Sequence, residues 1–138
     1  MALQKGGGAL WLGEHHNSVA DHQLQASILR LIVDTRDKES TTRRPVALGL
    51  EQVQVQFQPV LDDFVAGKMT LQEMKKQTEW DRRWTWPFEA YQPVFEAAQE
   101  LNVPLVALNV NSEDLALVEK NGLPGLPRDR LREYISDA

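Results

Sequence analysis

The chain of 138 residues contains no cysteine, which excludes structural disulfides and metal sites built from thiolates. It has no run of about 18 apolar residues, so no segment is expected to span a membrane. Its first residues also lack the apolar stretch of a secretory signal. Because neither cysteine usage nor a targeting segment marks a compartment, the localisation of the protein is left open.

The chain has no block of five like charges, and 15 Lys and Arg against 20 Asp and Glu give a formal net charge of −5. Nucleic acid is therefore not an expected partner, since nothing in the sequence offers a basic surface for a phosphate backbone. The glycines at 6–8 precede an apolar run instead of following one, so they do not form a phosphate-binding turn. No serine lies in a nucleophile elbow either.

Three apolar runs each stop at a polar residue that can do chemistry: 9–12 before Gly13 and Glu14, 46–50 before Glu51, and 104–108 before Asn109. Runs of about five apolar residues between helical segments are typical of parallel strands covered on both faces. The pattern predicts an α/β fold with a parallel sheet of at least three strands and crossover helices. Because ligands bind outside the carboxyl ends of such strands, one crevice is expected to collect four side chains. They are Glu14, His16, Glu51 and Asn109.

Helix signals separate these runs. Asn17 or Ser18 can cap a helix that runs to about Asp34, and its two apolar stripes predict burial on more than one side. Thr70 with Glu73 is typical of a capping box, and Gly67 ends the helix before it.

Residues 1–138 are interpreted as a single domain, and three strands make a thin sheet, so we expect this domain to be part of a larger one. Apolar surface left exposed would favour association of two copies. We therefore expect a homodimer, with Leu123, Leu126 and Leu131 near the contact.

All three histidines fall within eight residues, at positions 15, 16 and 22. Imidazole is the commonest metal ligand and titrates near neutral pH, and Glu14 beside it could be an oxygen ligand, an orienting partner or a general base. The alternative is structural: His15 at the surface, His16 near the helix cap and His22 in the core.

Glu51 follows a buried run, where a carboxylate costs free energy unless it is paired or faces a cleft. Together with Glu14 it could share a proton or a metal ion, which makes both carboxylates catalytic candidates. The alternative is a solvated strand end.

Three of the four tryptophans lie between residues 80 and 86. The spacing of Trp80 and Trp84 favours packing in a core or lid, whereas the functional alternative is a flat apolar wall for a planar ligand. Trp86 and the phenol of Tyr91 would extend such a wall.

Several of these residues resemble the ChaN-like family of haem-binding, iron-regulated proteins, which is related to erythromycin-esterase-like and Tiki-type proteins. The family opens with Gly-Glu-x-His-Asp and then a His-His pair. Here Gly13-Glu14-x-His16 matches the opening and His22 the second member of the pair, while Asn17 and Asp21 replace the Asp and the first His. Further matches follow in order: Glu51, Gln58-Pro59-Val60-Leu61-Asp62, Trp84, Trp86-Pro87, Tyr91-x-Pro93 and Asn109.

The resemblance implies the N-terminal part of a ChaN-like domain that binds haem or a divalent metal ion, in iron handling. Glu14 and His16 would be the metal ligands. The cofactor-binding residues would be His16, His22, Trp84, Trp86, Tyr91 and Asn109. Two alternatives stay open: a metal-dependent hydrolase with Glu14 or Glu51 as base, and a non-catalytic interaction domain with structural histidines.

Overall fold

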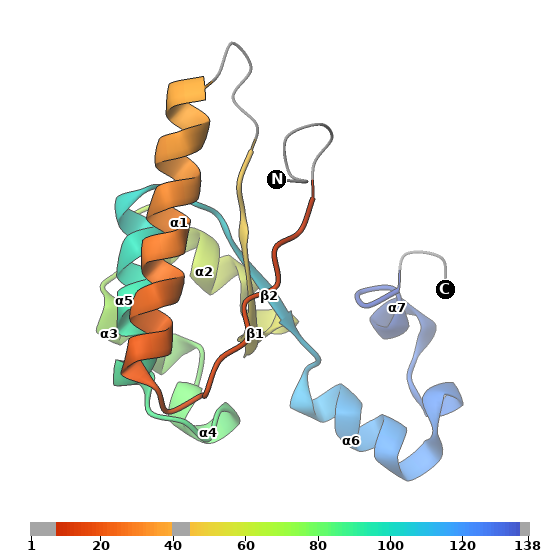
Figure 1. Ribbon diagram of the computed structural model, residues 1–138. Helices are drawn as coiled ribbons and strands as arrows, with labels where there is room; N and C mark the ends of the chain where they lie inside the picture. The colour runs from red at the N-terminus through yellow and green to blue at the C-terminus, as the bar shows by residue number, and fades with distance from the viewer. Residues whose placement is uncertain (1–7, 40–44, 136–138) are drawn as a thin grey trace.

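The structure is a computed structural model that describes residues 8–39 and 45–135 (Figure 1). The helices and strands, with two short 3-10 helices labelled η, are α1 (Val19–Glu39), β1 (Leu48–Gln54), η2 (Val55–Phe57), α2 (Gln58–Val65), α3 (Leu71–Gln77), α4 (Trp80–Arg83), α5 (Phe88–Glu100), β2 (Leu105–Asn109), α6 (Ser112–Asn121), η3 (Leu123–Gly125) and α7 (Arg128–Leu131).

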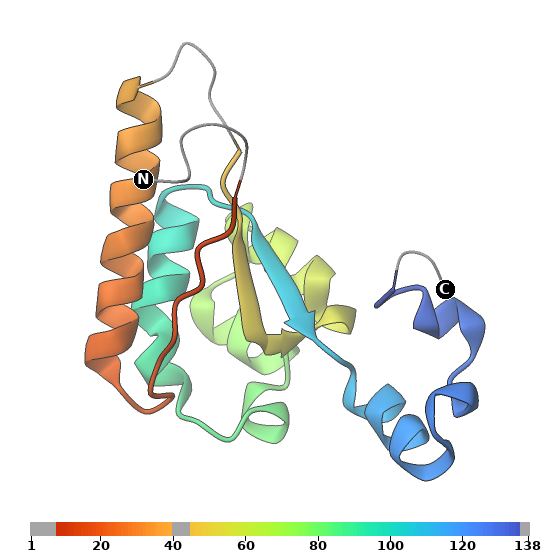
Figure 2. The same ribbon diagram turned by 45° about the vertical axis from the view of Figure 1, so that its right-hand side comes forward.

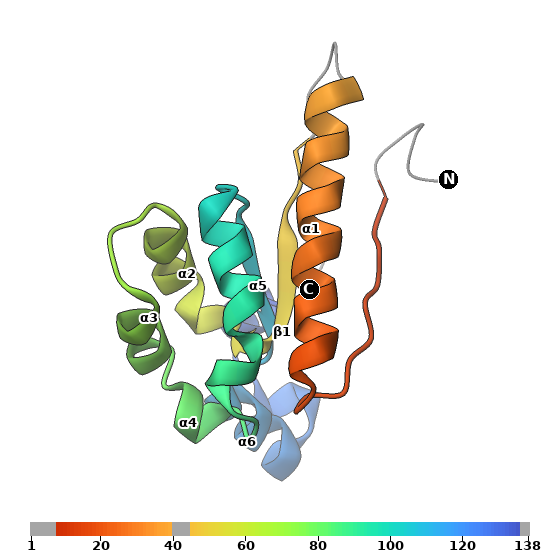
Figure 3. The same cartoon turned by 60° about the vertical axis from the view of Figure 1, so that its left-hand side comes forward.

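The sheet has two strands, β1 and β2, which pair in parallel. The segment from η2 to α5 forms the crossover between them, so the α/β class is confirmed in outline. The expectation of at least three strands is wrong for the described residues, because 8–15 form no strand, and the part of this segment nearer the N-terminus lies away from β1 in Figure 3. A strand needs a ladder partner and a face to bury, whereas the side chain of Trp11 in this segment is 87% exposed.

Helices cover one face of the sheet. Figures 1 and 3 show α1 and α5 side by side against this face, with α2 beside β2. The aromatic part of the core includes Phe64, Trp80, Phe88 and Phe95, all buried. On the other face Val106 and Leu108 of β2 stay exposed. The expected cover on both faces is therefore absent from the described part of the chain.

Helix α1 begins as expected, because Ser18 Oγ accepts a hydrogen bond of 3.2 Å from the backbone N–H of Asp21. It continues past the predicted end at Asp34 to Glu39. An ion pair between Lys38 and Asp34, one turn apart, supports the extra turn. Of its two apolar stripes, the one formed by Ala26, Leu29 and Val33 is buried. The other, which runs from Ala20 through Leu24 and Ile28 to Leu31, has Leu24 and Leu31 exposed.

The segment from α6 to α7 extends away from the rest of the molecule beyond β2 (Figure 2). Within it Leu123 is exposed, whereas Leu126 is buried and so is not available for contact with a second copy. Self-association itself stays a prediction that analytical ultracentrifugation can test. No helix among the described residues is long and apolar enough to cross a bilayer.

Candidate functional site

The centre of the site is the Glu14 carboxylate, whose side chain is only 8% exposed. Its Oε1 atom lies 3.0 Å from His16 Nδ1 and accepts a hydrogen bond of 3.1 Å from Gln52 of β1. Its Oε2 atom accepts one of 2.7 Å from Gln25 of α1. Glu14 thus joins the N-terminal segment to the helix layer and to the sheet.

These donors keep Glu14 charged. Burial alone raises the pKa of Glu14, but polar contacts with His16, Gln25, His22 and Tyr91 outweigh burial and lower the pKa to about 2. Among the described residues no lysine or arginine forms an ion pair with it. At neutral pH the site therefore holds a carboxylate that no lysine or arginine of the described part of the chain neutralises.

His16 lies at the surface of the group, about one third exposed. Its ring meets Trp84 edge to face at 5.4 Å between centroids and lies tilted against Trp86 at 5.6 Å. The charged Glu14 carboxylate favours the tautomer with the proton on Nδ1, because that atom can then donate to it. The Nε2 atom is left as a lone-pair donor for a ligand.

Glu51 approaches the same imidazole from β1, with Oε1 3.7 Å from His16 Nδ1. The prediction that Glu51 follows the strand is wrong, because β1 continues through it to Gln54. The β1–β2 register is irregular between Leu50 and Gln54, and such irregularities re-aim side chains. Here both Glu51 and its neighbour Gln52 contact the segment 14–16.

These contacts produce a group that could hold a metal ion. Glu14, His16 and Glu51 each offer one ligand atom, and these atoms lie within 4.8 Å of one another. The group combines one imidazole with two carboxylates, a donor set that suits zinc or manganese.

His22 lies behind Glu14, fully buried on α1, with its ring centroid 4.0 Å from that of Tyr91. Its Nε2 atom is 3.2 Å from Glu14 Oε2, but the contact is too bent for a well-formed hydrogen bond. Tyr91 accepts a hydrogen bond of 3.2 Å from Trp84 Nε1. Burial and the neighbouring carboxylate raise the pKa of Tyr91, so it remains a neutral phenol. These two residues support Glu14 from inside the fold.

The three tryptophans between residues 80 and 86 divide between the core and the site. Trp80 is buried against Phe88 and donates from Nε1 to the backbone oxygen of Trp86 at 2.9 Å. Trp84 and Trp86 instead flank His16, and Trp86 is partly exposed. We call Trp84 and Trp86 the aromatic wall.

Asn109, which was expected in the crevice, lies outside this group, and so does His15, which was not expected there. Asn109 pairs with Gln54 at the end of β2, and in the described residues it forms no hydrogen bond or ion pair with Glu14, His16 or Glu51. His15 is 88% exposed and binds Asp21 through its backbone N–H and Nδ1. It is the surface histidine that the structural alternative describes.

Sequence reasoning missed Gln25 and Gln52, the amide donors to Glu14. One signal for Gln25 was its position one turn after His22 on the buried side of the helix. A signal for Gln52 was a polar residue within a strand next to Glu51.

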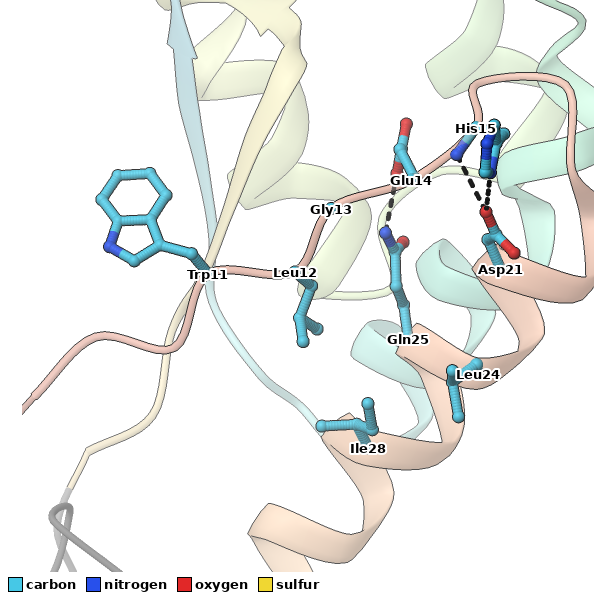
Figure 4. A pocket seen from close by; sticks show the side chains of 9 residues that line it. All are labelled: Trp11, Leu12, Gly13, Glu14, His15, Asp21, Leu24, Gln25 and Ile28. Carbon is cyan, nitrogen blue, oxygen red and sulfur yellow. Dashed lines mark hydrogen bonds and ion pairs between the residues drawn. The ribbon is translucent and has the colours of Figure 1, made fainter.

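A cavity of about 360 Å³ lies between the N-terminal segment and α1. Figure 4 shows Leu12, Leu24 and Ile28 near one part of it, with Glu14 and Gln25 at the other. Neither His16 nor Glu51 lines it. This cavity is therefore distinct from the His16 side of Glu14.

A family model described as haem-binding uptake, Tiki superfamily, ChaN matches residues 4–138, nearly the whole chain. Neither the curated proteins nor the solved structures contain a match.

Proposed function

The chain belongs to the haem-binding ChaN family of the Tiki superfamily, and on that premise we propose that it binds haem through Nε2 of His16. The observation that carries the proposal is the 3.0 Å contact between His16 Nδ1 and the charged Glu14 carboxylate. Histidines that ligate metals commonly donate their second ring N–H to a carboxylate, which fixes the ring and raises its basicity. Histidine is also a common axial ligand of haem iron.

The surroundings of His16 fit a planar ligand. The aromatic wall flanks the imidazole, and the partial exposure of His16 and Trp86 leaves this side reachable from solvent. Aromatic faces are suitable for packing against a macrocycle. Bound haem would supply the iron centre, while Glu14 holds the proton at Nδ1 and orients the ring. Iron handling is the role that we propose for such binding.

The test is a haemin titration followed by the Soret band, comparing His16→Ala with His15→Ala. The His16 variant should lose binding by more than about 100-fold, because it lacks the ligand itself and not an orienting partner. The His15 variant should bind as the unaltered protein does, since its side chain points to solvent. Equal losses in the two variants would contradict the assignment.

A divalent cation is the second candidate, favoured by the clustered ligand atoms of Glu14, His16 and Glu51. The hydrolase alternative depends on this cation, with a carboxylate as base for the attacking water. A cation would use Nδ1, which faces both carboxylates, whereas haem would use Nε2.

Glu51→Gln separates the two candidates. It should weaken binding of Zn²⁺ or Mn²⁺ in calorimetry by at least about tenfold, because a ligand is lost, and leave haemin affinity nearly unchanged. A large loss of haemin affinity would instead indicate that Glu51 contributes to the binding of haem as well as of the cation. Binding of neither ligand by the unaltered protein would favour the non-catalytic interaction domain.

A further inference from the structure

Arg83 is the last residue of α4 and directly precedes Trp84, yet its side chain is only 8% exposed. It donates from Nε to Glu79 at 2.7 Å, from Nη1 to Gln54 at 2.7 Å and from Nη2 to Glu113 at 2.8 Å. A buried guanidinium is costly unless such partners satisfy it. The Arg83 side chain therefore connects three parts of the chain: the turn before α4, strand β1 and helix α6.

The partner in β1 links Arg83 to the site. Gln54 lies two residues after Gln52, which donates to Glu14. The same strand thus holds the Glu14 carboxylate with one glutamine and the residue before Trp84 with the other. The guanidinium also lies 5.1 Å from the ring of Phe57, just after β1, which adds a cation–π contact.

The hydrogen bonds of Arg83 also support the turn before α4. Glu79 has a φ of 53°, in the left-handed region that a residue other than glycine adopts at a cost. Its carboxylate accepts hydrogen bonds from both Arg82 and Arg83. The bonds to Arg83 connect this strained turn to the sheet at the point where the chain enters the aromatic wall.

From these contacts we propose that Arg83 is a positioning residue, which holds the aromatic wall against His16 and so sets the affinity of the site for a planar ligand. This inference rests on the proposed function for its ligand. Its structural half, the placement of Trp84 beside His16, holds in the ligand-free protein.

The experiment compares Arg83→Gln and Arg83→Lys with Arg82→Gln as the control. Arg82 is the adjacent arginine, is 67% exposed and binds the same Glu79 carboxylate. The ligand-free readout is the NMR signal of the Trp84 indole N–H, assigned with Trp84→Phe, and of the His16 ring protons. The second readout is haemin affinity.

Arg83→Gln should shift or broaden both NMR signals and weaken haemin about tenfold, the lower end of the loss found for residues that orient metal ligands. Arg83→Lys should recover part of both effects, because an ammonium keeps the charge but cannot reach all three partners. Arg82→Gln should leave both readouts unchanged.

Unchanged Trp84 and His16 signals in Arg83→Gln would overturn the inference, as would equal effects of Arg82→Gln. If Arg83→Gln does not fold, Glu113→Gln removes one partner and should give the same shifts at smaller size; no shift there would also overturn it. If the unaltered protein does not bind haemin while the NMR shifts occur as described, the proposed function fails and the positioning of Trp84 by Arg83 stands.

Discussion

Two nearly buried carboxylates, Glu14 near the N-terminus and Asp114 in α6, differ in what surrounds them. Asp114 is 1% exposed, binds Arg130 at 2.7 Å and accepts further hydrogen bonds from Tyr134 and Asn111. Burial raises the pKa of Asp114, and the bonds from Tyr134 and Arg130 outweigh it and lower the pKa. The pKa of Glu14 is lowered too, but by two histidines, one amide and a phenol, with no arginine among these partners.

The difference separates a structural carboxylate from one that is available for function. The charge of Asp114 is neutralised by Arg130, and the pair ties α6 to the segment around α7. The charge of Glu14 has no such counter-ion within residues 8–39 and 45–135, and it acts on the imidazole of His16, which reaches the surface. A carboxylate kept ionised by neutral donors beside a reachable histidine is the arrangement expected at a binding site.

The strongest test of this comparison exchanges each carboxylate for its amide. Glu14→Gln should weaken haemin binding by about 10- to 100-fold, because His16 loses its orienting partner. Asp114→Asn should leave haemin affinity within about threefold and lower the free energy of unfolding by about 2 kcal/mol, because Arg130 loses its counter-ion. Haemin titration and urea unfolding measure the two effects. Equal losses of affinity would remove the functional distinction.

Lowering the pH should remove, over a defined range, the stability that the ionised Glu14 carboxylate contributes. The pKa of Glu14 is about 2 in the folded protein and about 4.5 in an unfolded chain, so its contribution is complete above pH 4.5 and is lost as the pH falls toward 2. Between pH 7 and pH 3.5 the loss should be about 1 kcal/mol. Urea unfolding across this range should show a shallower pH dependence in Glu14→Gln. An unchanged dependence would mean that Glu14 titrates normally.

The smallest effect is expected for a change at Asn109, which lies at the end of β2 and outside the cluster of Glu14, His16 and Glu51. Because its side chain has no hydrogen bond to Glu14 or His16, Asn109→Ala should change haemin affinity by about twofold or less. A loss as large as that of Glu14→Gln would extend the site to the end of β2, as the apolar run before Asn109 first suggested.

Local signals made much of the fold predictable. The cap at Ser18 and the capping box of Thr70 and Glu73 form as expected, with the backbone N–H of Glu73 donating to Thr70 Oγ1. Gly67, with a φ of 71°, follows α2. Each of these features depends on residues within about four positions of one another, so their spacing in the chain already determines them.

For the site, the sequence by itself predicted which polar side chains would come together. Glu14, His16 and Glu51 lie at or shortly after the ends of apolar runs, and they do meet. Only the tertiary structure decided that residues 9–13 form no strand, because pairing depends on a partner edge that no local pattern encodes. It also decided which amides reach the Glu14 carboxylate. Gln25 and Gln52 are 11 and 38 residues away along the chain, and they become its donors only when α1 and β1 pack around it.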